Sequence, residues 1–417
     1  MKPALALHAA GPLADSERAD VLDALRGFAL LGIFISHIPD FSGHSFMTPV
    51  AQAALDRFGV DGAAALIEDF LIRGKFYSLF SLLFGIGFAV QLESAGRCNA
   101  DFARRFARRL TILLVIGLIH ACFWYGDILK DYALIGFALI LLRRGKPRTI
   151  ASVTAFVFAL RIVWPVIVAA GVSMMSPMSS HGDPGGGFDA LTRTFATADP
   201  SAIFFANLEL VQLKALQMIY DGRAISILAM FLLGALIGKL GLHRNLSNHR
   251  TLLGAVFWVC APIGVIGNAV LTPLHAVTSD FPPTGMWVIE NMLYAIAVPA
   301  MAIGYASGFA WLWSGGWGSV LRWLAPAGRM ALTTYVSQTL IGVGLFYGVG
   351  LGLYGRIGLV EGTVLAVGIF GTQCVVAKVW LRWFRFGPIE WVWRRATYGA
   401  PIAFLRSVTP KVASAPV

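Results

Sequence analysis

Long apolar stretches recur along the whole chain and constrain its fold more than any other feature. A helix that crosses the hydrocarbon core of a bilayer, which is about 30 Å thick, needs about 20 mostly apolar residues. Charged residues make up only 13% of the 417 residues, against about 25% in a typical soluble domain. The sequence therefore predicts an all-α polytopic integral membrane bundle with about ten transmembrane helices. The predicted spans are residues 26–41, 76–94, 109–125, 128–142, 149–171, 218–238, 251–271, 287–311, 330–350 and 358–381.

The basic residues indicate how this bundle is oriented. With the N-terminus in the cytoplasm, most of the 33 Lys and Arg residues fall in cytoplasmic segments, as the positive-inside rule requires. Both termini are therefore predicted to be cytoplasmic, in the inner membrane of a bacterium. The net charge of +11 is scattered over separate loops, so it indicates contact with anionic membrane lipids rather than with nucleic acid. Arg161 and Lys378 are exceptions, because they lie within predicted spans.

The chain is predicted to form one membrane domain between two tails. The predicted segments are a cytoplasmic tail over residues 1–20, a membrane domain over 21–400 and a cytoplasmic tail over 401–417. The first tail has too few basic residues and too short an apolar run for a cleaved signal peptide. Two outer loops, 42–75 and 172–216, are long enough to form a vestibule or lid. The second is rich in Met, Ser and Gly over 174–187 and becomes amphipathic over 202–217.

The first predicted helix carries an arginine and a histidine among apolar residues, in LRGFALLGIFISHI at residues 25–38. At about 100° per residue, Arg26 and His37 lie on one helix face about 16 Å apart, and Asp23 shares that face. An arginine in hydrocarbon costs about 2.5–3.5 kcal/mol, so such a pair indicates a functional site. The guanidinium suits a phosphate, and the imidazole suits a general base or acyl acceptor. Alternatively, Arg26 only reaches the headgroups and His37 caps the far end of the helix.

His120 and Asp127 form a second candidate pair. Their spacing returns both side chains to nearly the same face if the helix continues that far. An aspartate hydrogen-bonded to a histidine fixes its tautomer and raises its basicity, which is a common catalytic use. In the alternative interpretation, Asp127 caps the next helix and His120 bonds a neighbouring backbone group. The sequence leaves both interpretations open.

Further polar side chains lie inside or at the ends of the predicted spans: Lys75, Ser78, Asp221, Arg223, Glu290, Asn291, Gln338 and Gln373. Buried ion pairs often only hold helices together. The pairs expected here are Lys75 with Asp127 and Arg223 with Glu290. The candidate substrate-binding residues are Arg26, Lys75, Ser78, Arg223 and Glu290.

Two weaker patterns concern helix packing and the membrane surface. Residues 74–78 echo residues 222–226, and each stretch begins a helix that ends with glycines. Small residues let transmembrane helices approach closely, so helix packing is the favoured explanation. The aromatic-rich stretch over 380–393 predicts an interfacial amphipathic helix.

The sequence lacks the motifs of the common soluble enzymes. A GxSxG elbow, a Walker A loop and an HExxH motif are all absent. The four cysteines form no CxxC pattern or Cys/His cluster. Neither a metal site nor a disulfide is therefore predicted.

Several stretches of the chain resemble the YeiB-like family of bacterial membrane proteins, which is largely a domain of unknown function. They are RGFALLGIFISHI at residues 26–38, KFYSLFSLLFGIGFAVQ at 75–91, GLIHACFWYGDIL at 117–129, GRMALTTY at 328–335, FYGVGLGLYG at 346–355 and FRFGPIEWVWR at 384–394. The resemblance runs from about residue 17 to 406, and its C-terminal motifs are the most specific. Many relatives carry Asn where this chain has His37, and often Asn in place of Thr334.

The spacing of Arg26 and His37 also resembles, more distantly, that of the transmembrane acyltransferases. These include heparan-alpha-glucosaminide N-acetyltransferase and the integral-membrane O-acyltransferases. The resemblance implies an acyltransferase-like bundle that moves an acyl group from cytoplasmic acyl-CoA to a sugar or related acceptor on the other side. His37 would then be catalytic, and Arg26 would support donor binding or helix geometry.

The leading hypothesis is a membrane acyltransferase that moves an acyl group, such as acetyl from acetyl-CoA, to an envelope or exported small-molecule or glycan acceptor. His37 would be the base or acyl carrier, Arg26 would bind the donor, and His120 with Asp127 would act on the acceptor. The alternative is a transporter of a small anionic or zwitterionic solute, for which buried charges and proline-interrupted helices are typical. The sequence leaves the oligomeric state open.

Overall fold

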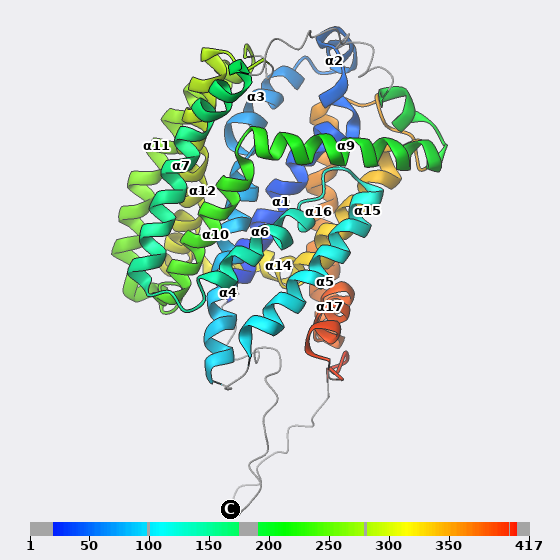
Figure 1. Cartoon of the computed structure of the whole chain (residues 1–417). Helices are drawn as coiled ribbons and strands as arrows, with labels where there is room; N and C mark the ends of the chain where they lie inside the picture. Colours follow the sequence, from blue (N-terminus) through cyan, green and yellow to red (C-terminus); the bar gives the residue numbers. More distant parts are fainter. Residues whose placement is uncertain (1–19, 98–100, 175–190, 279–281, 400, 407–417) are drawn as a thin grey trace, which may run out of the picture.

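The computed structural model describes residues 20–97, 101–174, 191–278, 282–399 and 401–406, and most of these residues are helical (Figure 1). Within these ranges the only extended pairing is an isolated bridge between Phe384 and Leu405. The predicted all-α polytopic bundle is therefore confirmed. Most of the two predicted tails and of the glycine-rich stretch at 174–187 lies outside the described residues. The principal helices are α1 (Asp20–Ser42), α2 (Pro49–Leu55), α3 (Asp61–Leu71), α4 (Lys75–Arg97), α5 (Phe102–Phe123), α6 (Leu129–Leu141), α7 (Pro147–Met174), α9 (Pro200–Tyr220), α10 (Arg223–Lys239), α11 (Arg250–His275), α12 (Gly285–Leu312), α14 (Ala325–Arg329), α15 (Ala331–Phe346), α16 (Leu359–Trp383) and α17 (Pro388–Tyr398).

Each of the ten predicted spans coincides with a helix, but not every helix is long enough to cross a membrane. Eight segments of the described chain are long and apolar enough to do so. Helix α6 has 13 residues and α15 has 16, which is short of a full crossing at about 1.5 Å per residue. Helix α6 is short because the chain leaves α5 at Trp124 with extended backbone, and the Asp127 carboxylate accepts the Lys130 N–H of the next helix.

The helices form a bundle with α1 near its centre (Figure 1). Helices α7, α11 and α12 pack together along one flank, and α10 packs between α4 and α7. In the apolar window of α1, 61% of the residues are buried, against 11% for the segment that contains α11. The start of α1 and α17 lie at one end of the bundle, which we call the terminal side. Helices α2 and α3 lie at the other end, which we call the loop side.

Helix α9 differs from the arrangement predicted for residues 202–217, which were expected to form part of an outer loop. It is a continuous helix of 21 residues, and the Asp199 side chain caps its first turn. In Figure 1 it runs across the long helices instead of along them. Gly222, with a left-handed φ of 70°, then turns the chain into α10. The predicted span at 218–238 therefore begins late, at Arg223, because α9 occupies its first residues.

Helices α4 and α10 cross in close contact because glycines lie at the crossing. A Cβ atom at Gly85 or at Gly234 would lie 2.0 Å from a backbone carbonyl oxygen of the partner helix. Both helices also start after a left-handed glycine, Gly74 with φ 81° and Gly222 with φ 70°. The sequence echo at the starts of these helices thus belongs to two helices packed on each other, which agrees with a packing role for their small residues.

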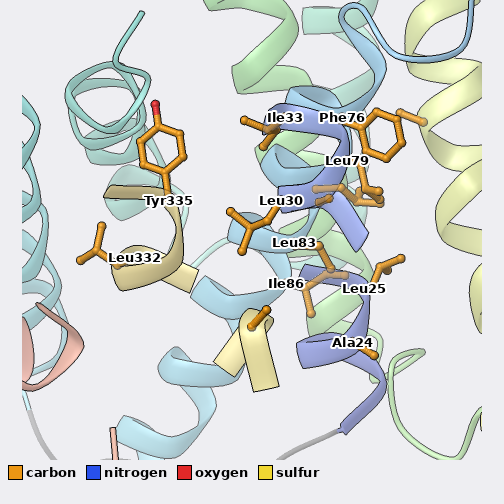
Figure 2. Packing of buried hydrophobic residues seen from close by; sticks show 14 of the residues in the cluster. Ala24, Leu25, Leu30, Ile33, Phe76, Leu79, Leu83, Ile86, Leu332 and Tyr335 are labelled. Atoms are coloured by element: carbon orange, nitrogen blue, oxygen red, sulfur yellow. The ribbon is translucent and has the colours of Figure 1, made fainter. Parts of the chain in front are cut away.

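The core around α1 has two different sides. Figure 2 shows Leu30 and Ile33 extending from α1 toward the side on which Tyr335 of α15 lies, whereas Phe76 and Leu79 of α4 lie on the other side. Leu30 is 0% exposed and Ile33 is 4% exposed. Since α1 is packed by other helices on both sides, its polar residues are held within the protein instead of facing lipid.

The aromatic stretch over 380–393 is not one helix, contrary to the prediction. Helix α16 ends at Trp383, and α17 begins at Pro388 after an extended Gly387. The Glu390 carboxylate then accepts the backbone N–H groups of Leu332 and Thr333 at 2.6 and 2.9 Å. Burial raises the pKa of Glu390 above its usual range, although these hydrogen bonds oppose the shift. Proline and glycine break the helix so that α17 can cap the start of α15.

Candidate active site between two cavities

A polar cavity of about 770 Å³ opens within the loop-side half of the bundle. Charged and aromatic side chains from several helices line it. They include His37, Asp40, Asp127, Lys214, Arg223 and Glu290. A cavity of this size can hold a small polar molecule.

A second cavity, of about 250 Å³, lies in the terminal-side half. Its charged lining is mostly basic and comes from α1, α5, the α14–α15 segment and α17, while its walls include Leu30, Leu83 and Leu113. The charged lining residues are Asp23, Arg26, Arg109, Arg329, Glu390 and Arg394. Arg26 pairs with Asp23 at 2.7 Å, and the Arg109 guanidinium lies 3.6 Å from the centre of the Trp393 ring. Arginines in an apolar-walled cavity favour a ligand with phosphate groups and an apolar arm.

The two cavities meet at Ile33 and Ile128, which line both of them. Arg26 and Ile33 line the terminal-side cavity, and Ile33 and His37 line the loop-side cavity. A single face of α1 therefore runs from one cavity to the other, as the helical spacing of Arg26 and His37 predicts.

An aromatic cluster surrounds His37 near this junction. The His37 ring lies 4.3 Å from the Trp124 ring and 6.2 Å from the Tyr335 ring, measured between centroids. Tyr335 lines the terminal-side cavity, whereas Trp124 and His37 line the loop-side one. No described residue donates or accepts a hydrogen bond at either nitrogen of His37. The imidazole is therefore held by ring packing, with its nitrogens available to a ligand.

His120 and Asp127 form a buried pair beside the same cluster. The Nδ1 of His120 lies 2.8 Å from the Asp127 Oδ1, and the two side chains are 3% and 0% exposed. The Nε2 of His120 is buried and has no hydrogen-bond partner among the described residues, and the His120 ring centroid lies 5.2 Å from that of Tyr335. The aspartate favours the tautomer with a proton on Nδ1, which leaves Nε2 as a free proton acceptor.

Asp127 both pairs with His120 and caps α6, one with each carboxylate oxygen, whereas the bond from His120 to a neighbouring backbone group in the alternative interpretation is wrong, because the His120 Nδ1 bonds Asp127 and its Nε2 has no partner among the described residues. Oδ1 bonds His120, while Oδ2 accepts the N–H of Lys130 at 2.9 Å and so caps α6. The pairing does not need a continuous helix, because α5 ends at Phe123 and the connecting loop brings Asp127 back to His120. These two hydrogen bonds hold the Asp127 carboxylate against the His120 imidazole.

Comparison with known proteins shows the family of this chain. The family described as "Protein of unknown function (DUF418)" matches residues 237–400. The chain is 31% identical to "Uncharacterized protein YxaH" of Bacillus subtilis (strain 168), over 93% of this chain and 96% of that protein. It is 30% identical to "Uncharacterized protein YeiB" of Escherichia coli (strain K12), over 92% of this chain and 97% of that protein. The chain belongs to the YeiB-like DUF418 family. No solved structure matches it.

The match to the DUF418 description covers only part of the site. Glu290, Tyr335 and Glu390 lie inside residues 237–400, whereas His37 and the His120–Asp127 pair lie before them. The similarity to the two full-length YeiB-like relatives covers nearly the whole chain. The described part of this family member holds no group of three or more His, Cys, Asp or Glu side chains suited to a metal ion.

Two ion pairs predicted from the sequence are wrong. The Nζ of Lys75 donates to the Asp69 carbonyl oxygen at 2.5 Å and does not reach Asp127. Lys75 and Ser78 are buried, and neither lines the two cavities, because α4 turns them toward neighbouring backbone. These two residues are thus poor candidates for substrate contact.

The predicted pair of Arg223 and Glu290 is replaced by two others. Arg223 pairs with Asp221 at 2.8 Å, since Gly222 folds the aspartate back onto the start of α10. Glu290 lies 2.6 Å from the His275 Nδ1. Arg223 and Glu290 both line the loop-side cavity. Their predicted contact with a substrate stays a prediction, whereas the predicted ion pair between them is wrong.

Sequence reasoning missed three features of the candidate site. Lys214 of α9 pairs with Asp40 at 3.2 Å, beyond the reach of any helical spacing rule. Tyr335 joins the histidine cluster from α15. Arg161 was recognised only as a charge within a span, and it lines the loop-side cavity with 2% exposure. A buried arginine in a transmembrane segment is itself a signal of function.

Proposed function

We propose that this protein is an inner-membrane acyltransferase that moves an acyl group from a cytoplasmic acyl-CoA to an acceptor in the loop-side cavity. The observation that carries the proposal is the buried His120–Asp127 pair. Asp127 lines the loop-side cavity, and the His120 ring lies 5.2 Å from the ring of Tyr335, which lines the terminal-side cavity. A buried base with an orienting carboxylate is a common device for activating a hydroxyl group.

The terminal-side cavity is the proposed donor site. Its arginines suit the phosphates of coenzyme A, and its apolar walls suit the pantetheine arm that would carry the thioester toward Ile33. This assignment agrees with the excess of basic residues predicted for the cytoplasmic side. Arg26, at the start of the α1 face, is the proposed donor-binding residue.

The proposed reaction is a direct acyl transfer. The His120 Nε2 removes the proton of an acceptor hydroxyl, and the hydroxyl oxygen attacks the thioester carbonyl carbon. The carbon–sulfur bond breaks, and the imidazolium returns the proton to the coenzyme A thiolate. The products are the acyl ester and free coenzyme A thiol, so atoms and charge balance. His37 would serve as a second base or as a transient acyl carrier, and trapping of an acyl-enzyme in a single turnover separates these two roles.

The test is the release of coenzyme A thiol from acetyl-CoA by the purified full chain in detergent, with water or added sugars as acceptor. We expect His37→Ala and His120→Gln each to lower the rate by about 100-fold or more. His249→Gln, outside both cavities, is the matched control and should retain the rate. Full activity of both His37→Ala and His120→Gln, or no thiol release by the wild type, would overturn the proposal.

A transporter is the second candidate, supported by the same two cavities that approach each other from opposite sides. The cavities share only the apolar residues Ile33 and Ile128, and such a barrier between two cavities suits a transporter that opens to each side in turn. Counterflow of a labelled anionic or zwitterionic solute in proteoliposomes without acyl donor separates the two functions. Transport without thiol release would favour the transporter.

A further inference from the structure

The loop-side cavity holds a buried cation that has no carboxylate partner in the described part of the chain. Arg161 of α7 is 2% exposed and lines this cavity. Its Nε donates to the Ser226 Oγ at 3.0 Å, and its Nη1 donates to the Asn291 carbonyl oxygen at 3.3 Å. The Tyr294 ring centre lies 5.9 Å from the Arg161 Cζ. None of these groups carries a negative charge, and no described carboxylate lies within 4.0 Å of this guanidinium.

The other charged side chains of the cavity are paired, which sets Arg161 apart. The pairs and distances are Lys214–Asp40 at 3.2 Å, Lys130–Asp131 at 3.1 Å, Arg223–Asp221 at 2.8 Å, Arg73–Asp69 at 3.3 Å, His275–Glu290 at 2.6 Å and His120–Asp127 at 2.8 Å. The carboxylates of the cavity thus already have partners, and none is left to neutralise Arg161.

An arginine buried away from bulk water normally has an anionic partner, because its charge is costly to desolvate alone. The Arg161 guanidinium also has hydrogen-bonding capacity left, since its Nη2 donates to no described residue. A guanidinium presents paired donors that match the oxygens of a carboxylate or a phosphate. The missing partner of Arg161 therefore has the chemistry of an oxyanion.

We infer that Arg161 binds an anionic group, a carboxylate or phosphate, of the small molecule that occupies the loop-side cavity. The identity of that molecule as the acyl acceptor rests on the proposed function, but the anion site itself does not. Ser226 and Asn291 hold the guanidinium in place, and Tyr294 packs near it. The acceptor is thus an acidic molecule, such as an acidic sugar or a phosphorylated one, in preference to a neutral sugar.

The test measures the midpoint of thermal unfolding of the purified full chain in sodium acetate, sodium phosphate or sodium chloride at equal ionic strength. A ligand that binds only the folded state raises this midpoint. We expect acetate or phosphate to raise it by several degrees relative to chloride in the wild type, and the effective anion identifies the group preferred. Arg161→Gln should lose this response, and Arg148→Gln, at the exposed end of the same helix, should keep it.

A second variant tests the site without removing the arginine. Ser226→Asp places a carboxylate beside the Arg161 Nε, so it should fold with Arg161 paired and should lose the response to added anions. An equal response in Arg161→Gln and wild type, as binding at the terminal-side arginines would give, overturns the inference. The inference is also overturned if the unfolding midpoint of the wild type is the same in acetate, phosphate and chloride. Because no acyl donor is present, these outcomes do not depend on acyl transfer.

Discussion

The Nδ1 of His120 lies 2.8 Å from the Oδ1 of Asp127, although α5 ends between the two residues. The loop that brings them together also makes Asp127 the cap of α6. The position of the histidine and the start of the next helix are thus set by one carboxylate. The fold of the α5–α6 region and the position of the proposed base therefore depend on the same residue, Asp127.

Replacing Asp127 with Asn should greatly lower the rate of acyl transfer and should change the stability of the fold little. Asn keeps an oxygen that can accept the Lys130 N–H, but it no longer favours the tautomer with a free Nε2. We expect a fall in kcat of about 100- to 10,000-fold with little change in KM for acetyl-CoA. Asp101→Asn is the matched control, because the Asp101 carboxylate caps α5 outside both cavities. Equal loss in the two variants would assign Asp127 a structural role only.

A larger side chain at Ile33 should separate the two cavities. Ile33 lines both of them and is 4% exposed, so Ile33→Trp would fill the junction. We expect thiol release to stop while binding of coenzyme A, measured by calorimetry, persists. Ile33→Val, which makes the side chain smaller instead of larger, is the control and should keep both thiol release and coenzyme A binding. Undiminished turnover in the tryptophan variant would show that the donor does not pass this point.

The crossing of α4 and α10 should not tolerate a side chain at Gly85. A Cβ there would lie 2.0 Å from a carbonyl oxygen of α10, so Gly85→Leu must push the helices apart. Overpacking of this kind costs about 1–3 kcal/mol and sometimes more. Gly368→Ala in α16, where a Cβ would meet no atom within 4 Å, should be neutral or stabilising. Thermal unfolding in detergent compares them, and equal midpoints would contradict the close crossing.

Glu390 should give the protein a pH-dependent stability. Burial raises its pKa in the folded state, so the folded chain holds the proton more tightly than the unfolded chain does. This contribution is full below the unfolded pKa of about 4.3 and is lost as the pH rises through the folded value. Relative to Glu390→Gln, the wild type should therefore lose stability from about pH 4 toward neutrality. Thermal unfolding of the two proteins at each pH measures this difference in stability. If the wild type instead gains stability relative to the variant over this range, the hydrogen bonds from the Glu390 carboxylate to the start of α15 outweigh the effect of burial.

The sequence predicts the helical membrane fold well because apolar length and periodicity are local properties. The shared face of Arg26 and His37 follows from helix geometry alone, and the structure agrees with it. Where the chain bends, local rules fail. Gly222 folds Asp221 onto Arg223, and this removes the pair predicted between Arg223 and Glu290.

The rest of the site depends on contacts between residues far apart in the sequence. Lys214 reaches Asp40 from α9, a helix that was expected to belong to a loop. Tyr335 joins the two histidines from the far end of the chain. That Arg161 has no carboxylate partner among the described residues becomes visible only when every neighbouring carboxylate has been assigned to its own partner. Spacing in a single sequence contains none of this information.

The most direct test of the central claim uses membrane vesicles that expose either the terminal side or the loop side of the protein. Acetyl-CoA is supplied only outside the vesicles, and free thiol is measured there for the wild type and for His120→Gln. We predict thiol release only where the terminal side faces the donor, and its loss in His120→Gln. Release from either side, or equal release by the variant, would contradict a reaction carried out between two opposed cavities.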